Sequence, residues 1–402
     1  MEPKIRFKGF EGEWKETIWG NHIVSTHTGT NLLGEVSNKG IPLLKMGNIQ
    51  RGFFDLDKME YLAANQNPPV NCIANYGDFF YNTRNTLELV GKGATWMKKD
   101  GIYAFNSNIA ICKLDGIDTF FFNYLYNTLR SIKQVQARAK GTTSVAAVYM
   151  RDLKSIELAL PHITEQQAIA SYFTTLDSQI SASTSRLTSL KQMKAASLQA
   201  MFPQEGETVP KIRFKGFKGE WNISRLGDFS TSFSGGTPTA GVAEFYGGEI
   251  PFIRSGEIHE NRTELFLTEA GINNSSAKVV EKGTLLYALY GATSGEVGIS
   301  KIKGAINQAI LAIYPNKSVN KIFLSNYLQL KKQRIVGEFL QGGQGNLSGA
   351  LVKSILVTYP SLEEQQAIAS YFTSLDRQIS LQSQRLEKLK QIKSACLDKM
   401  FI

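Results

Sequence analysis

The 17 residues TEQQAIASYFTTLDSQI at 164–180 return, with three substitutions, as EEQQAIASYFTSLDRQI at 363–379. Both copies run on into long segments in which apolar residues recur at steps of three and four, starting at Ile169 and Ile368. This spacing places the apolar side chains in one stripe along an α-helix, a pattern typical of coiled coils. The repeat therefore predicts two long helices, and their packing decides the fold.

Each predicted helix covers about 38 residues and is roughly 57 Å long at 1.5 Å per residue. One stripe on each helix is best buried when the two helices pack against each other. The order of the chain favours an antiparallel pair with a globular unit at each end. The alternative is a pair of ordinary core helices inside one larger domain. Capping residues are predicted as Thr164 with Gln167, and Ser361 with Glu364.

A second repeat precedes each globular region. KIRFKGFEGEW at 4–14 returns as KIRFKGFKGEW at 211–221. The offset between the copies is 207 here, but it is 209 within the interior and 199 at the helices. Insertions and deletions therefore lie in the interior, where recognition surfaces tolerate them, and the repeated ends are predicted to form a supporting frame. The expected boundaries are a first domain at 1–160, a helix at 161–203, a second domain at 204–359 with a linker at 204–210, and a second helix at 360–402.

The interior of each copy predicts mixed secondary structure. Short β-like runs occur at 77–82, 108–114, 283–291 and 309–315. Each copy also has one amphipathic segment, at 119–139 and at 320–340, followed by a loop rich in Gly, Ser and Thr at 140–144 and at 341–349. We expect two α+β (α/β-like) globular domains.

The charge of the chain indicates an anionic partner. The net charge is +10, and the two helical segments contribute +1 each, which leaves +8 for the rest of the chain. A basic surface on globular domains favours nucleic acid as the partner.

Several other classes of protein are not favoured by the sequence. It has no apolar run of 18 residues and no apolar segment near Met1 that would act as a secretory signal. Its three cysteines and four histidines are scattered without metal-ligand spacing. We therefore expect a reduced, cytoplasmic protein without a metal site.

Candidate DNA contacts are polar residues in the loops and at the strand ends of both interiors. Arg and Lys suit guanine, Asn and Gln suit adenine, and hydroxyl groups hold phosphates. Many of these residues are also typical of turns, so the set carries more weight than any single member. The candidates are Lys45, Asn82, Thr83, Arg84, Asn106, Lys140 and Thr142 in the first domain, and Arg254, Ser255, Tyr290, Thr293, Ser294, Asn307, Gln308, Gln344 and Asn346 in the second.

No motif predicts catalysis strongly. NPPV at 67–70 is similar to the Asn-Pro-Pro-aromatic motif of amino-methyltransferases, but Val70 replaces the aromatic residue. GATSGEVG at 291–298 lacks the Gly-Lys-Ser/Thr ending of a phosphate-binding loop. A binding protein without an enzymatic activity or cofactor of its own is expected. The alternatives are a self-sufficient DNA adenine methyltransferase that uses NPPV, and a coiled-coil scaffold that binds only proteins.

Taken together, these segments resemble the specificity subunits of type I restriction–modification systems. The resemblance rests on the repeated segments at 4–14 and 211–221, which we call the heads, and on residues 234–258 and 283–313. It also rests on the EQQAIASYF helices that follow a proline. It covers essentially the whole chain, although residues 1–160 depart more from the pattern. NTRNTLELVGKGATW stands there in place of the YGATSGEVG of the second copy.

The resemblance implies two target-recognition domains separated by two antiparallel spacer helices. Each domain would read one half of a bipartite site in double-stranded DNA, and the helices would set the spacing between the halves. Two modification (methyltransferase) subunits would bind the chain, and restriction (translocase and nuclease) subunits would join the complex. S-adenosylmethionine, ATP and Mg²⁺ are expected on those partners. Because the two interiors differ, the site is expected to be asymmetric.

Overall fold

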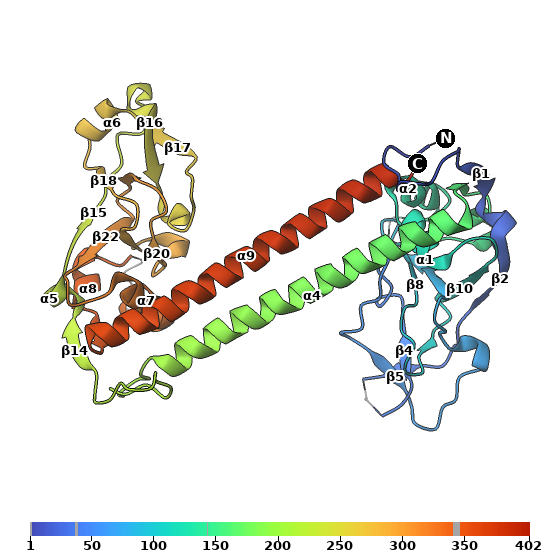
Figure 1. The fold of residues 1–402 in the computed structure, drawn as a ribbon, viewed down its shortest axis with the longest axis horizontal. Helices are drawn as coiled ribbons and strands as arrows, with labels where there is room; N and C mark the ends of the chain where they lie inside the picture. The colour runs from blue at the N-terminus through green and yellow to red at the C-terminus, as the bar shows by residue number, and fades with distance from the viewer. Residues whose placement is uncertain (1, 37–38, 143, 341–345) are drawn as a thin grey trace. The chain divides into compact units, whose positions relative to one another are not determined.

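The chain divides into two compact units. Met1–Thr184 and Gln384–Ile402 form the first unit, and Ser185–Ser383 form the second. Each unit holds one globular domain and one end of each of two continuous helices, α4 (Ile163–Met201) and α9 (Leu362–Met400) (Figure 1). The computed structural model describes residues 2–36, 39–142, 144–340 and 346–402.

Helices α4 and α9 run antiparallel within the first unit. The Tyr172 hydroxyl lies 3.4 Å from Cys396 Sγ, and Lys393 Nζ lies 2.5 Å from Asp177 Oδ1. Residue numbers therefore rise along α4 while those of the contacting residues fall along α9.

The second unit repeats these contacts at the equivalent positions of the two helices. The hydroxyl oxygens of Ser197 and Tyr371 are 2.9 Å apart, and Lys194 Nζ lies 2.6 Å from Asp376 Oδ1. Equivalent helix residues differ by 199 in number. The duplicated helix sequence thus produces the same antiparallel pairing twice, once in each unit.

The apolar stripe of each helix is buried against its globular domain. Phe173 of α4 and Phe372 of α9 occupy equivalent positions, and both are fully buried. The ring of Phe173 lies 5.9 Å from that of Phe401, in a core that also contains Trp14. Complete burial of a phenylalanine side chain stabilises a fold by about 1.5–3 kcal/mol. The stripe therefore fixes each helix end to the domain beside it.

The repeated heads clamp the start of one helix in each unit. Arg6 donates from Nε to Glu165 Oε1 at 2.8 Å and from Nη2 to Oε2 at 2.7 Å. Arg213 binds Glu364 through the same two atoms, at 2.7 Å in both cases. Because a two-bond guanidinium–carboxylate pair fixes orientation as well as distance, the head sets the direction in which the helix leaves the domain.

The same heads also contact the end of the other helix. Ile5 N donates to Lys399 O at 3.0 Å, and Ile212 N donates to Ala200 O at 2.9 Å. The first of these bonds brings the two termini together in the first unit (Figure 1). Each head therefore joins the N-terminal turn of one helix to the C-terminal turn of the other.

Short strands build the first globular domain. They are β1 (Lys15–Ile18), β2 (Ile23–Thr28), β3 (Gly34–Glu35), β4 (Pro42–Leu44), β5 (Glu60–Leu62), β6 (Phe79–Asn82), β7 (Arg84–Asn85), β8 (Gly93–Thr95), β9 (Ala104–Phe105), β10 (Ile109–Leu114), β11 (Lys140–Gly141), β12 (Ala146–Ala147) and β13 (Glu157–Leu160). Two four-stranded sheets have the orders β2-β10-β6-β8 and β3-β5-β4-β9, and smaller sheets have the orders β11-β12-β7 and β1-β13. All neighbours are antiparallel except β4 and β9.

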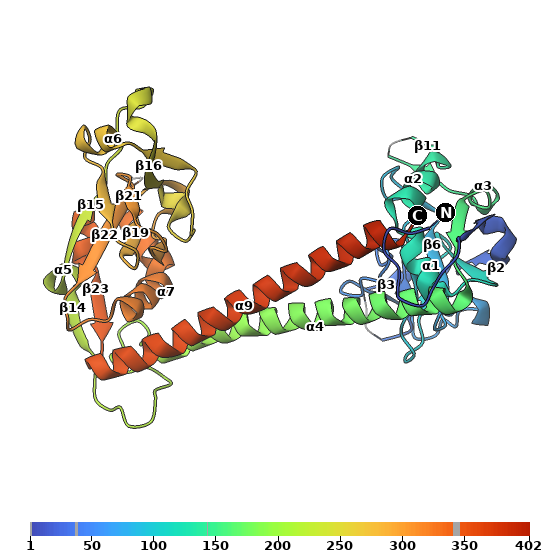
Figure 2. The same ribbon diagram turned by 45° about the horizontal axis from the view of Figure 1, so that its top comes forward.

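The second globular domain repeats this arrangement. Its strands are β14 (Asn222–Arg225), β15 (Ser230–Ser234), β16 (Tyr246–Ile253), β17 (Leu265–Leu267), β18 (Lys278–Val280), β19 (Leu285–Ala288), β20 (Val297–Ile299), β21 (Gly304–Ile306), β22 (Ile310–Pro315) and β23 (Leu356–Tyr359). They form sheets of order β15-β22-β19-β20, β17-β16-β21-β18 and β14-β23, in which only β16 and β21 are parallel (Figure 2). The predicted α+β class agrees with this mixed content.

The helix predicted at 119–139 is interrupted, whereas the one predicted at 320–340 is continuous. The first domain has α1 (Thr119–Tyr126) and α2 (Leu129–Ala137), and the second has α7 (Lys321–Leu340). The Thr128 hydroxyl accepts the Ser131 amide at 3.3 Å, which caps α2 as a separate helix. The short helices are α3 (Met150–Leu153), α5 (Leu226–Phe229), α6 (Glu269–Asn273) and α8 (Gly349–Ser354).

Of the two predicted capping boxes, one is confirmed for its hydroxyl half, because the Glu364 carboxylate binds Arg213, and the other is wrong. Ser361 Oγ accepts the Glu364 amide at 3.4 Å ahead of α9. Thr164 does not cap α4, because the helix already begins at Ile163 and the Thr164 hydroxyl contacts His162 Nδ1 at 3.0 Å. Of the described helices, none combines the length and apolar character that a membrane span requires.

Candidate nucleic-acid interface

The carboxyl ends of two parallel strands meet in each globular domain, β4 with β9 and β16 with β21. Asn106 N donates to Leu44 O at 3.0 Å, and Asn307 N donates to Ile253 O at 3.2 Å. These equivalent bonds place predicted site residues from two separate segments side by side in both domains.

A paired cation follows β4 and β16 at this junction. Lys45 Nζ lies 2.6 Å from Glu60 Oε1, and Arg254 binds both Glu257 at 2.9 Å and Glu264 at 2.6 Å. Burial alone would raise the pKa of Glu257, but hydrogen bonds from the Arg254 side chain and from main-chain amides lower it to about 2. Both predicted cations are thus neutralised within their own domain, and a phosphate would have to compete with these carboxylates.

A second pair of equivalent main-chain hydrogen bonds gives both domains the same main-chain frame. Val148 N donates to Thr83 O at 2.9 Å, and Leu347 N donates to Leu289 O at 3.0 Å. The two bonds join the chain after β6 and β19 to the segment before α3 and α8, respectively. Equivalent main-chain positions can therefore be compared directly.

This frame aligns Arg84 of the first domain with Tyr290 of the second. Arg84 pairs with Ala147 between β7 and β12, and Tyr290 forms an isolated bridge with Asn346. A guanidinium group and a phenol group thus occupy equivalent places on the same backbone. The main-chain hydrogen bonds are the same in the two domains, whereas the side chains at these positions differ.

Arg84 and Lys140 lie on one face of the β11-β12-β7 sheet. Lys140, Ala147 and Arg84 stand directly opposite one another in the register of the three strands. Because neighbouring strands are about 4.8 Å apart, the two cations start about 10 Å from each other with only a methyl group between them. Lys140 also pairs with Asp152 at 3.2 Å. The exposed Arg84 guanidinium has no bonding partner in the part of the chain that the structure describes.

A hollow of 530 Å³ opens beside Arg84. Exposed at 45%, the Tyr149 ring also borders it, with the Arg151 guanidinium 5.1 Å from the ring centre. Side-chain hydroxyl and amide groups can bond to base edges and phosphates, and aromatic rings can stack on bases. The polar side chains that line the hollow include Thr26, Thr28, Asn31, Thr83, Ser107 and Asn108.

The equivalent region of the second domain carries amide and hydroxyl groups. Asn346 is exposed at its bridge to Tyr290. The Thr237 hydroxyl donates a hydrogen bond to Oε1 of the exposed Gln308, and the Thr293 hydroxyl donates to Tyr290 O at 3.3 Å. The two domains therefore present different hydrogen-bonding groups at matching places.

Two of the predicted contact residues are buried. Asn82 is 0% exposed, its amide nitrogen donates to Met46 O at 3.1 Å, and its buried Oδ1 has no hydrogen-bond partner among the described residues. Ser294 is 7% exposed and donates to Leu289 O at 3.2 Å. Neither side chain reaches the surface, so we exclude both from the candidate interface.

The remaining predicted residues occupy turns and strand ends. Thr83 donates to Asn108 O at 2.9 Å, and Asn106 Oδ1 accepts the Asn108 amide at 3.2 Å. Thr142 shares a hydrogen bond with Ser144 at 3.2 Å.

Ser255 opens a short 3-10 turn in the second domain, and the buried Oδ1 of Asn307 has no hydrogen-bond partner in the part of the chain that the structure describes. Gln344 lies outside the described residues.

Sequence reasoning missed the chain turn that follows β2 and β15. A Cβ at Gly29 would lie 1.9 Å from Phe105 O, and a Cβ at Gly235 would lie 1.9 Å from Ile306 O. Only glycine permits this approach, which brings Asn31 to the hollow of the first domain. The glycine shared by HTGT and SGGT was the signal that could have located this turn.

The described residues include no group of three or more His, Cys, Asp or Glu side chains arranged to hold a metal ion. The NPPV stretch leads into the short turn Val70–Cys72, where Val70 is 89% exposed. That valine lies on the surface, at the place where a methyltransferase motif has an aromatic residue.

The chain matches one family model twice. Residues 33–192 and residues 218–391 match the model described as the type I restriction modification DNA specificity domain. The two matches cover most of the chain and fall one in each sequence repeat.

Two relatives and one solved structure are similar to the chain. It is 23% identical to the provisionally named MjaX specificity subunit of a type I restriction enzyme from Methanocaldococcus jannaschii, over 89% of this chain and 86% of that protein. It is 32% identical to the type I restriction enzyme MjaIX specificity subunit of the same organism, over 42% of each protein. The crystal structure of the type I restriction–modification S subunit from M. genitalium has the same fold, with a TM-score of 0.68 and 16% identity over 100% of this chain and 99% of that one.

Proposed function

Because the chain belongs to the family of type I restriction–modification DNA specificity subunits, we propose that its two globular domains each read one half of an asymmetric two-part DNA site. The single observation that carries this proposal is the alignment of Arg84 with Tyr290 on one shared main-chain frame. Equivalent domains with identical readers would recognise a palindrome. Domains that carry different DNA-contacting side chains on the same main-chain frame would instead recognise two unrelated half-sequences.

Exposed side chains on the equivalent Arg84–Ala147 and Tyr290–Asn346 bridges favour particular bases. An arginine bonds bidentately to guanine O6 and N7, and an asparagine bonds to adenine N6 and N7, each contact being worth about 1–3 kcal/mol of discrimination. We assign a guanine or phosphate contact to Arg84 in the first half-site. An adenine contact is assigned to Asn346 in the second. Lys140 supports the first contact from the same sheet face.

Helices α4 and α9 are proposed to set the spacing between the half-sites. Each is continuous over 39 residues, which corresponds to about 58 Å. Each helix has one end in the first unit and the other in the second. A rigid pair of this length would fix how far apart two half-sites must be for both domains to bind.

Two modification subunits are proposed to dock on the helix copies. Gln167 and Ser171 are exposed on α4, and their counterparts Gln366 and Ser370 are identical and also exposed on α9. Two identical partners need two equivalent surfaces, and exposed identical residues provide them. The restriction subunits would join through this complex.

In the proposed complex, this chain recognises the DNA sequence and catalyses no reaction itself. Methyl transfer, ATP hydrolysis and DNA cleavage would take place on the partner subunits, which would hold S-adenosylmethionine, ATP and Mg²⁺.

The test compares the purified chain alone with the chain bound to its cognate modification subunit. The complex should methylate a single two-part sequence in host DNA, while the chain alone should methylate nothing. Affinity for DNA should fall steeply as salt rises, because phosphate neutralisation releases counterions. Methylation by the isolated chain would favour the self-sufficient methyltransferase, and salt-independent or absent DNA binding by the complex would favour the protein scaffold.

A further inference from the structure

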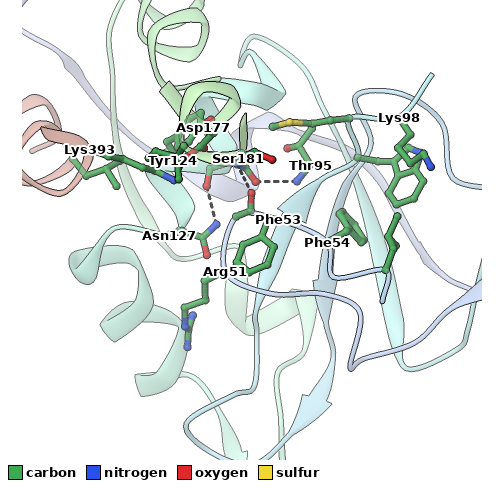
Figure 3. Close-up of a pocket in the computed structure, with 17 residues that line it drawn as sticks. Arg51, Phe53, Phe54, Thr95, Lys98, Tyr124, Asn127, Asp177, Ser181 and Lys393 are labelled. Carbon is green, nitrogen blue, oxygen red and sulfur yellow. Dashed lines mark hydrogen bonds and ion pairs between the residues drawn. The ribbon is translucent and has the colours of Figure 1, made fainter. Parts of the chain in front are cut away.

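A pocket of 570 Å³ lies within the first unit, at the meeting of the globular domain with α4 and α9 (Figure 3). Its walls come from the loop at 51–56, the segment at 95–98, α1, and the facing turns of the two helices. Pockets of about 300–1,000 Å³ are typical of ligand sites. Nothing in the DNA-reading role uses this cavity.

Hydrogen bonds brace the pocket walls. The Asn123 side chain accepts the Thr95 amide at 2.9 Å and donates to Gly52 O at 3.0 Å, so it ties the loop to the strand. Asn127 donates to Gly93 O at 2.9 Å. The cavity is therefore preformed, and a ligand would not have to order its walls.

Aromatic and sulfur-containing side chains form the mouth of the pocket. Phe53 is 59% exposed and Met97 is 38% exposed, although both are large apolar residues. Behind them Phe54 packs edge-on against Trp96, with ring centres 4.8 Å apart. Exposed aromatic residues and methionine are enriched at protein interfaces, where they anchor a partner's side chains.

The net charge of the pocket lining is positive, because Arg51 and Lys98 add to Lys393, which is paired with Asp177. Arg51 donates to Glu88 O at 2.9 Å, and Lys98 donates to the Tyr103 hydroxyl at 2.8 Å, so both cations have neutral acceptors. Burial lowers the pKa of Arg51, while the nearby Tyr126 and Glu88 act in the opposite direction. A carboxylate from an occupant would give these cations an anionic partner.

The second unit has different residues at the equivalent loop. IPLLKMGNIQRGFF at 41–54 aligns with IPFIRSGEIHENRT at 250–263, so Glu260 and Arg262 replace Arg51 and Phe53. In the second unit a carboxylate thus stands at the position of Arg51, and a cation stands at the position of the exposed Phe53 ring.

We propose that this pocket anchors one of the two modification subunits by taking an apolar or aromatic side chain flanked by a carboxylate from an acidic segment. The inference rests on the proposed function, because it takes modification subunits as partners. Duplex DNA fits the cavity poorly, since its bases are stacked and a base would have to leave the stack to enter. With the anchor in one unit only, the two modification subunits bind with unequal affinity.

The test measures the two binding steps of the cognate modification subunit to the full chain by native mass spectrometry and sedimentation. Arg51→Glu with Phe53→Arg gives the first unit the residues of the second. We expect the tighter step to weaken at least tenfold and the weaker step to stay unchanged. Glu260→Gln with Arg262→Gln is the matched control in the second unit, and it should change neither step.

A photo-crosslinking phenylalanine analogue at position 53 gives an independent readout. It should crosslink to an acidic segment of the modification subunit. Crosslinks to DNA, or two unchanged binding steps in the double variant, would overturn the pocket assignment while leaving the proposed function intact. Failure of the wild-type chain to bind any modification subunit would instead contradict the proposed function itself.

Discussion

Arg6 and Glu165 are 159 residues apart in the chain and form an ion pair of two hydrogen bonds, in which the carboxylate is 2% exposed. Arg213 and Glu364 form the same pair, with the carboxylate 1% exposed. The near identity of the two heads is explained by this clamp. Each head must fit the same helix start, whereas the domain between them is free to diverge.

Breaking the clamp is expected to destabilise either unit by a similar amount. Arg6→Ala leaves a buried carboxylate without its cation, which costs about 3–5 kcal/mol. Arg213→Ala should cost the same, while Lys8→Ala on the exposed side of the first head should change little. Urea unfolding of the three variants measures these losses. A loss below about 1 kcal/mol for both arginines would contradict the clamp.

The chain turns at Gly29 and Gly235 are expected to tolerate no side chain. Alanine at either position would bring Cβ within 1.9 Å of a main-chain oxygen, so we expect a loss of about 2 kcal/mol or more. Gly47 and Gly256 are equivalent glycines at which an added Cβ would have nothing within 4 Å, and they serve as controls. Thermal unfolding should separate the two pairs. Equal stability of all four alanine variants would show that the close approach is not real.

Acid should weaken the second domain through Glu257. Its pKa is lowered to about 2 from an ordinary value of 4.5, so its stabilising effect is present above pH 4.5 and is lost as the pH falls toward 2. The corresponding loss is about 3 kcal/mol. Glu257→Gln should therefore be less stable than the wild type at pH 7, and the gap should close by pH 2.

Urea unfolding over this pH range checks the acid prediction. Glu264→Gln is the control, because Glu264 is 81% exposed and binds the same arginine. A gap between wild type and Glu257→Gln that stays constant with pH would contradict the assignment.

Substitutions on the two equivalent bridges, Arg84–Ala147 and Tyr290–Asn346, should act on separate half-sites. Arg84→Ala should relax specificity in the first half-site, and Asn346→Ala in the second, each by about 1–3 kcal/mol. If Arg84 binds a phosphate, binding should instead weaken uniformly and the salt slope should fall by about one. Competition binding with DNA libraries distinguishes these outcomes. Loss at both half-sites from one substitution would argue against independent reading.

Arg254, one of the candidate DNA contacts, is unsuitable as a probe of DNA reading. From sequence it is simply a cation beside a strand end. In the structure it is held by two carboxylates, so its reversal would break an ion-pair network whether or not DNA is bound.

The two long helices and the heads that bind them could be predicted from sequence because both are repeated. The helix stripe and the heads occur twice, and four β-like runs coincide with β6, β10, β19 and β22. The break after α1 was missed because Thr128 caps a new helix, and capping hydroxyls resemble ordinary helix-surface residues in sequence.

The candidate interface could be predicted only in part. Loop composition pointed to Arg84 and Asn346, but it also pointed to Asn82, which is fully buried. Whether a polar residue near a strand end faces solvent depends on which loop covers it, and that is set by long-range packing. The equivalence of Arg84 and Tyr290 depends on main-chain bonds that the diverged sequences do not reveal.

The central claim is that two independent readers are held at a distance set by α4 and α9. One heptad inserted after Thr184 and one after Ser383 lengthens both helices by about 10 Å and keeps the apolar stripe in phase. Methylation mapping of host DNA with this variant and its modification subunit should recover the same two half-sequences, separated by about three more base pairs. An unchanged spacer, or altered half-sequences at the old spacing, would contradict the account.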